Sequence, residues 1–245
     1  MTTLVLAALV LLTATAEAAA QSPLVAELRR VSLRYHEDPT RLDTLREGLE
    51  KAAAADPRPE HLVALAQIEF IWGDIRAKTQ EEKLKAYDAG RQAAKRVAES
   101  NPRDVVARFW YATNTARWGQ TNGVVHSLFL LPEVKREIGA ILDLDAGFAP
   151  VYALAGNVYY EVPGLLGGDL AKAEEMFRKG IELSPRYTLM RVGLAKTLIK
   201  RGRPDEARRE LTMVIEEKSP LNPADWTMKD VPDARRLLAE IGKGA

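Results

Sequence analysis

Small and apolar residues between Leu194 and Pro220 recur every three or four positions, with one interruption in the middle. This spacing places them on one face of each of two consecutive helices. The residues on the two faces are Leu194, Ala195 and Leu198 in the first helix, and Ala207, Leu211 and Val214 in the second. Gly202 suits the left-handed position after a helix end, and Pro204 suits the first turn of the next helix. The pattern predicts two helices joined by a tight turn.

The segment before this pair repeats the same plan. Its matching positions are Ala155, Gly156 and Tyr159 in one helix, and Ala173, Phe177 and Gly180 in the next. Pro185 and Pro220 close the two units, 35 residues apart. This arrangement resembles the tetratricopeptide repeat, a helix pair of about 34 residues with small residues where the two helices touch.

Earlier segments show the same alternation of helical patterns and breaks. Successive units close at Pro57, Pro102, Ala146, Pro185 and Pro220. The passage from Val124 to Pro132 fits either a short helix or an ordered loop, and a last helix from Pro232 to Ile241 is typical of the cap that a repeat stack needs. We therefore predict an all-α, tetratricopeptide-like stack of about five helix pairs with a C-terminal capping helix. Residues 21–245 form a single domain in this interpretation.

Residues 1–20 have the pattern of a signal peptide. Leu4 to Leu12 is an unbroken apolar run, too short to span a bilayer, and the small-residue sites Ala16-Glu17-Ala18 and Ala18-Ala19-Ala20 follow it. No Lys or Arg precedes Arg29, so the usual basic start is absent. We expect export to the periplasm; an uncleaved anchor or a cytosolic helix is the alternative.

The composition of the chain argues against several classes of function. The formal net charge of +1 gives no indication of nucleic-acid binding. With no cysteine, the chain has no disulfide, no thiolate metal site and no site for lipoprotein acylation. His36, His61 and His126 are not spaced as metal ligands, and no catalytic constellation is recognisable. The sequence predicts a protein that is not an enzyme and needs no metal or cofactor.

Candidate binding residues lie on two predicted first helices and one loop. Trp110, Asn114 and Trp118 are spaced i, i+4, i+8, and Asn157 with Tyr160 occupies the corresponding part of the next unit. These residues either line a groove or pocket or belong to the core.

In the loop that follows the second of these helices, Leu165 and Leu166 either pack on a neighbouring repeat or cover a ligand or partner. This loop lacks the Gly-Lys-Ser/Thr of a phosphate loop, and Asp169 is placed to cap the next helix.

Four segments resemble the T-component family of TRAP transporters. They are FWYATNTARWG, GNVYY, PGLLGGDLAKAEEMFRKGIELSP and ADWTMKDVPDARRLLAEI, within a match that covers about Asn101 to Ile241. The resemblance implies a periplasmic all-helical protein that associates with a TRAP substrate-binding protein and takes part in ligand transfer. Members are often lipid-anchored through an N-terminal cysteine, which this chain lacks.

Two functional hypotheses follow. The first is a non-catalytic periplasmic accessory of a TRAP-type transport system that binds a substrate-binding protein, a small-molecule ligand, or both. The second is a general tetratricopeptide-repeat scaffold that binds a protein or peptide at the cell envelope. Self-association into a homo-oligomer is compatible with either hypothesis.

Export makes a direct prediction. Because the apolar run is followed by two small-residue sites, protein recovered from the native cell envelope should begin near Ala19 or Gln21. N-terminal sequencing of that material checks the prediction. Full-length chain recovered from the cytosol would contradict it.

Overall fold

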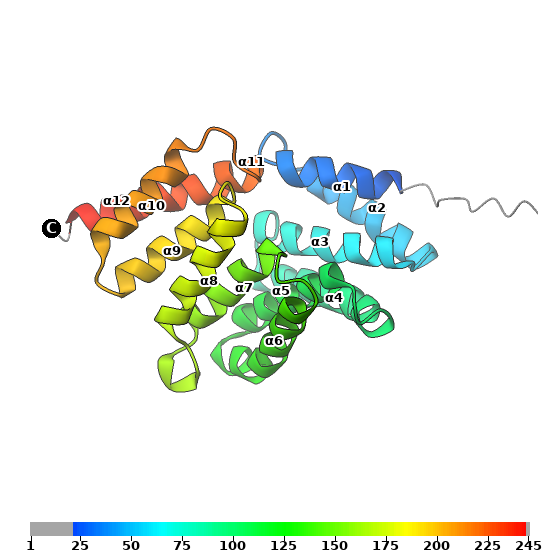
Figure 1. Ribbon diagram of the computed structural model, residues 1–245. Helices are drawn as coiled ribbons and strands as arrows, with labels where there is room; N and C mark the ends of the chain where they lie inside the picture. The colour runs from blue at the N-terminus through cyan, green and yellow to red at the C-terminus, as the bar shows by residue number, and fades with distance from the viewer. Residues whose placement is uncertain (1–21, 244–245) are drawn as a thin grey trace, which may run out of the picture.

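The computed structural model describes residues 22–243, so the predicted signal peptide lies outside the described residues. Five helix pairs follow one another: α1 (Pro23–Arg34) with α2 (Arg41–Ala55), α3 (Pro59–Ile75) with α4 (Gln80–Ser100), α5 (Val105–Asn122) with α6 (Val124–Leu144), α7 (Ala149–Glu161) with α8 (Leu170–Leu183), and α9 (Thr188–Lys200) with α10 (Pro204–Glu216) (Figure 1). Residues 22–243 contain no strand. The all-α, tetratricopeptide-like stack of helix pairs is confirmed.

Three shorter elements complete the fold. A 3-10 turn, η1 (Gly164–Leu166), lies between α7 and α8. After α10, the chain forms α11 (Pro223–Asp225), the π-helical segment η2 (Trp226–Asp230) and α12 (Val231–Lys243) without a break between them. These last three elements form one helical segment at the C-terminal end of the stack.

Local signals at the helix ends act as their chemistry predicts. Gly202 has a φ of +72° directly after α9, and Pro204 is the first residue of α10. The Asp169 carboxylate accepts hydrogen bonds from the backbone N–H groups of Ala171 and Lys172 at 2.8 and 3.1 Å, which confirms it as the cap of α8. Asp169 satisfies backbone donors that a helix start leaves without an intrahelical partner, whereas Pro204 simply lacks such a donor and Gly202 supplies the left-handed turn after a helix end.

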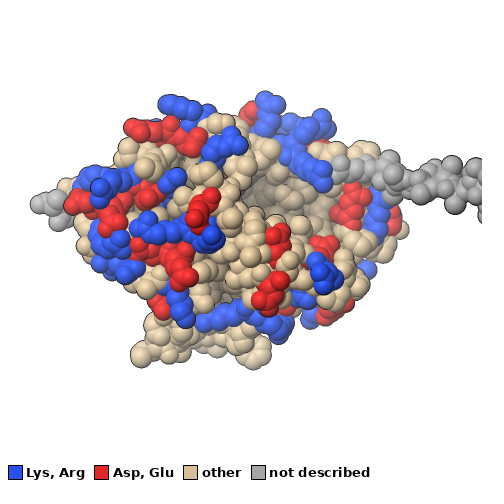
Figure 2. Space-filling model, viewed as in Figure 1, with Lys and Arg blue, Asp and Glu red and all other residues tan. Residues whose placement is uncertain are grey.

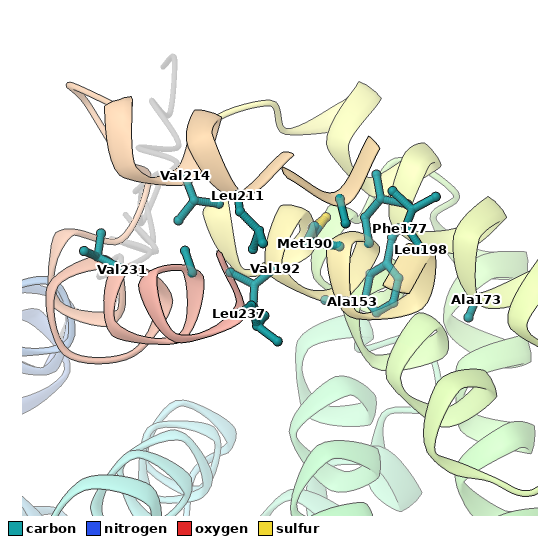
Figure 3. Packing of buried hydrophobic residues seen from close by; sticks show 14 residues of the cluster. Ala153, Ala173, Phe177, Met190, Val192, Leu198, Leu211, Val214, Val231 and Leu237 are labelled. Atoms are coloured by element: carbon teal, nitrogen blue, oxygen red, sulfur yellow. The ribbon is translucent and has the colours of Figure 1, made fainter. Parts of the chain in front are cut away.

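The C-terminal core depends on small residues around one aromatic ring. Phe177 of α8 is fully buried, and a Cβ atom added to Gly156 of α7 or Gly193 of α9 would lie 2.7 or 2.4 Å from its ring. Figure 3 shows Phe177 together with Leu198, Met190 and the other buried residues of this cluster. Glycine at these two positions lets α7 and α9 pack closely against the ring. The repeat pattern predicted this close approach at Gly156 but did not include Gly193.

Two segments differ from the prediction. The ambiguous passage from Val124 to Pro132 is the first part of a continuous helix, α6, which contains Pro132. Pro132 has no backbone N–H, so it cannot donate the helical hydrogen bond to the carbonyl group of Leu128, four residues earlier, and the proline itself is exposed. The predicted last helix begins at Pro223 instead of Pro232, because the Asn222 side chain caps the backbone N–H groups of Ala224 and Asp225.

The C-terminal segment does more than cover the last repeat. α12 packs on α10 as the predicted cap would, but α11 also contacts α1 at the opposite end of the chain (Figure 1). Ala224 is fully buried within the apolar cluster formed by α1, α2 and α3, and the Tyr35 hydroxyl donates a hydrogen bond to Asp225. The stack therefore closes on itself into a ring.

The close approach of helices around Phe177 makes a stability prediction. Gly156→Leu and Ala173→Leu should each lower the free energy of unfolding by about 1–3 kcal/mol, because a larger side chain must displace a packed neighbour. Urea unfolding measures the change.

Gly139→Leu is the matched control for this prediction. A Cβ atom at Gly139, on the exposed side of α6, has no neighbour within 4 Å. This variant should unfold at the wild-type urea concentration or higher. Equal midpoints for all three variants would show that the helix packing is wrong.

Candidate functional site

The first helix of each pair lies on the inner side of the curved stack. Consecutive first helices contact one another in the series α1, α3, α5, α7 and α9, whereas consecutive second helices have no contact of that extent. Elements on the inner side of a curve must be closer together than those on the outer side. We call the surface formed by α3, α5, α7 and α9 on this side the inner wall. Figure 2 shows a recess with mostly uncharged surroundings near the point where α11 meets α1.

Half-buried aromatic side chains form a continuous row from α3 across α5 to the residue that precedes α7. The ring centroids of Phe70 on α3 and Trp110 on α5 are 5.6 Å apart. Phe109 is 5.1 Å from Trp110 and 5.4 Å from Phe148, which directly precedes α7. These separations and the tilted or edge-on ring angles are typical of favourable aromatic pairs. Trp110 was a predicted site residue. Phe70 was not, because the two residues are 40 positions apart and no local sequence pattern indicates a contact at that distance.

Asn157 and Tyr160 lie on α7 and are both half-buried. The Asn157 side chain has no hydrogen-bond partner within residues 22–243, so its amide is available to a bound molecule. The Lys200 ammonium group lies 3.7 Å from the centroid of the Tyr160 ring, and it also donates to the Tyr160 backbone carbonyl at 3.4 Å. Lys200 therefore orients the tyrosine ring through a cation–π contact.

Asn114 does not belong to a lined groove, and that prediction is wrong for this residue. Its side chain is 0% exposed. The amide nitrogen donates to the carbonyl oxygens of Ala66 and Trp110 at 3.0 and 2.9 Å. A Cβ atom at Gly90 on α4 would lie 2.7 Å from the Asn114 oxygen, so the side chain fills the space that this glycine leaves. Asn114 instead joins α3, α4 and α5 inside the protein.

Trp118 is also separated from Trp110. The Arg91 guanidinium group of α4 lies 5.2 Å from its ring centroid, and His126 of α6 packs edge-on at 5.8 Å. Trp118 therefore faces the second helices. Eight residues turn an α-helix by about 80° more than two full turns, so the spacing i, i+8 does not keep two side chains on one narrow face. The predicted row of Trp110, Asn114 and Trp118 is divided among three environments.

A buried charge network borders the inner wall where the ring closes. The Asp74 carboxylate of α3 accepts hydrogen bonds from the Tyr87 hydroxyl at 2.7 Å, from Arg117 of α5, and from Lys229 of η2 at 3.2 Å. Burial opposes the ionisation of Asp74, but Lys229 and Arg117 together hold the pKa of its carboxyl below the usual range. The Lys229 pKa is raised by Asp225 and Asp74 against the opposing effect of burial. Both groups are therefore charged at neutral pH.

Leu165 and Leu166 lie away from the inner wall. They belong to η1, and their side chains are 102% and 48% exposed. Gly167 has a φ of +91°, and a Cβ atom at Gly168 would lie 1.7 Å from the Val162 carbonyl oxygen. Only glycine fits these two positions, and backbone hydrogen bonds from Gly167 to Gly164 and from Gly168 to Pro163 close the turn that presents the leucines to solvent. Packing on a neighbouring repeat is excluded for Leu165.

Other kinds of site have little support in the described chain. Within residues 22–243, no three His, Cys, Asp or Glu side chains are grouped as metal ligands. His61 is buried, and its ring nitrogen Nδ1 lies 2.9 Å from the Asp56 carbonyl oxygen, a structural contact. In the same range, no helix combines the length and the hydropathy required to cross a membrane.

Comparison with known proteins supports the fold. Residues 165–220 match the model of the tetratricopeptide repeat family. The crystal structure of TTC0263, a thermophilic TPR protein of Thermus thermophilus, superposes with a TM-score of 0.64 at 18% identity, covering 89% of this chain and 99% of that chain. MamA residues 41 to the end, from Desulfovibrio magneticus RS-1, are 16% identical with a TM-score of 0.49, covering 86% of this chain and 99% of that chain. None of the curated proteins compared with the chain matches it.

The protein is thus a tetratricopeptide-like helical-repeat protein. Repeat proteins of this class are generally non-catalytic scaffolds that bind other proteins on their extended concave surface. Here that concave surface is the inner wall, with the aromatic row, Asn157 and Tyr160 as its candidate contacts.

The different environments of the two asparagines can be tested by stability. Asn114→Ala should lower the free energy of unfolding by about 1–3 kcal/mol, because it removes the hydrogen bond to the Ala66 carbonyl and leaves the space of the amide unfilled. Asn157→Ala should change it by less than about 0.5 kcal/mol, since that amide has no partner to lose. Urea unfolding of both variants measures the difference. Similar losses for the two would place Asn157 in the core as well.

Proposed function

We propose that this protein is a non-catalytic periplasmic accessory of a TRAP-type transport system. In this role the inner wall binds the substrate-binding protein of the system, together with the small molecule that it delivers. The observation that carries the proposal is the combination of a half-buried aromatic row with an amide that has no internal partner. A site of this kind buries apolar area while a few polar groups fix the orientation of the bound molecule.

The sequence resemblance supports the same surface. FWYATNTARWG forms most of α5, and GNVYY ends one residue before the last residue of α7. Both helices belong to the inner wall, and they supply Trp110, Asn157 and Tyr160. The segments that resemble the T-component family therefore coincide with the helices that provide the candidate contacts.

Periplasmic location is part of the proposal and depends on the N-terminal sequence pattern. A transport accessory of this type must meet its substrate-binding protein in the compartment where that protein collects its ligand. The apolar run from Leu4 to Leu12 and the alanine-rich sites after it support export. The absence of cysteine removes disulfide formation as a complication in that compartment.

Binding can be tested with the TRAP substrate-binding protein of the native organism, purified and titrated calorimetrically against the full chain. Trp110→Ala and Tyr160→Ala should each weaken binding at least about tenfold, because central aromatic side chains dominate the energy of such interfaces. Asn157→Ala should weaken binding without lowering the urea midpoint.

Arg208→Ala is the control, since this exposed residue lies on α10, outside the inner wall. Its affinity should equal that of the wild type. If the substrate-binding protein does not bind, but peptides recovered from envelope proteins bind and depend on Tyr160, the chain is a general scaffold. Equal affinity for all variants would remove the inner wall as the site.

A further inference from the structure

The most exposed large apolar side chains of residues 22–243 come from only two segments. Four side chains exceed 70% exposure: Val124 at 72%, Val125 at 77% and Phe129 at 82% on α6, and Leu165 at 102% in η1. Leu166 beside it is 48% exposed. Single exposed leucines are ordinary on protein surfaces, but a group of five such residues is not.

The two segments lie side by side. The Lys135 ammonium group on α6 donates a hydrogen bond to the Gly167 carbonyl oxygen at 3.2 Å, which joins the middle of α6 to the loop that carries η1. In Figure 1 the beginning of α6 and this loop both project from the lower edge of the molecule. Figure 2 shows the same edge as two uncharged projections. We call the surface formed by residues 124–132 and 162–168 the apolar edge.

The apolar edge contains no charged side chains. Basic side chains lie directly behind it. Residues 124–132 and 162–168 contain no Asp, Glu, Lys or Arg. Lys135 and Lys172 both lie 5.7 Å from the centroid of the Tyr159 ring, and neither forms an ion pair within the described chain. Figure 2 shows a band of basic side chains immediately above the uncharged projections.

The shape of this edge favours lipid over a folded protein as the partner that covers it. A protein interface requires a packed surface of matching shape, whereas the apolar edge consists of two separate convex projections. Lipid can adapt to such projections. Backbone hydrogen bonds from Gly167 N–H to the Gly164 carbonyl and from Gly168 N–H to the Pro163 carbonyl, both 3.1 Å long, hold the loop in this conformation. Little conformational entropy is therefore lost when the leucines enter an apolar phase. Lysine side chains behind the edge can reach the phosphate groups of lipids while their stems remain in apolar surroundings.

We propose that the apolar edge is a membrane-docking surface. Leu165, Leu166 and the exposed residues of α6 enter the interfacial region of an anionic bilayer, and Lys135 and Lys172 bind the lipid phosphates. The recess in Figure 2 faces the viewer while the edge lies below it, so docking leaves the recess open to solvent. This proposal does not depend on the transport role.

Flotation of the full chain with lipid vesicles tests the proposal. Vesicles of phosphatidylglycerol and phosphatidylcholine should bind the protein, and Leu165→Ser or Phe129→Ser should each weaken binding about tenfold or more. Lys135→Gln and Lys172→Gln should each weaken it about fivefold on anionic vesicles and have no effect on pure phosphatidylcholine. Leu166→Ser should also weaken binding, and Leu221→Ser, its matched control, should leave binding unchanged, because both leucines are 48% exposed and only Leu166 belongs to the edge. Equal binding of all variants would overturn the proposal.

A fluorescent probe separates docking by the edge from any binding by residues 1–20, which all variants share. The chain has no cysteine, so Leu165→Cys and Leu221→Cys each provide one labelling position for an environment-sensitive dye. Anionic vesicles should shift the emission of the dye at position 165 to the blue and leave position 221 unchanged. Vesicle binding without a shift at position 165 would contradict the proposal. So would a shift that follows protein concentration without lipid, which would show that a second copy of the chain covers the edge.

Discussion

The contact between the two ends of the chain determines the shape of this protein. Lys229 of η2 lies 3.0 Å from Asp225 and 3.2 Å from Asp74, and the Tyr35 hydroxyl of α1 donates to Asp225. Partly buried charges of this kind are tolerated because each has a partner of opposite sign, and removal of one partner leaves the other at a high cost in free energy. An open repeat stack can flex along its length, whereas a stack with joined ends holds its first helices at a fixed separation. The inner wall depends on that separation.

The ring distributes its side chains over surfaces with different chemistry. The inner wall carries Trp110 within an aromatic row, together with an unpartnered amide at Asn157. The apolar edge carries exposed apolar residues, such as Leu165 in the η1 loop, and lies apart from the recess. Binding on the inner wall and docking through the edge therefore use separate residues, and the two proposals can be tested independently by mutation.

Local rules explain why so much of the fold was predictable. Helix ends depend on one or two residues, as at Gly202 and Asp169, and these residues act through their own backbone geometry or hydrogen bonds. Small residues at helical spacing predicted the close approach of α7 and α8, where Gly156 leaves room for Phe177. The repeat carries this information within each unit of about 35 residues, so a single sequence is sufficient to read it.

The sequence by itself determined the helices, their pairing and the small-residue contacts between neighbours, because these features depend on residues close together in the chain. Tertiary structure alone decided which polar and aromatic side chains became accessible. Asn114 and Asn157 occupy similar places in successive first helices, but Gly90 of another helix creates the space that buries the first, while no residue bonds to the second. The ring closure has the same origin: Lys229 and Asp74 are 155 positions apart, and no periodic pattern records a pairing at that distance.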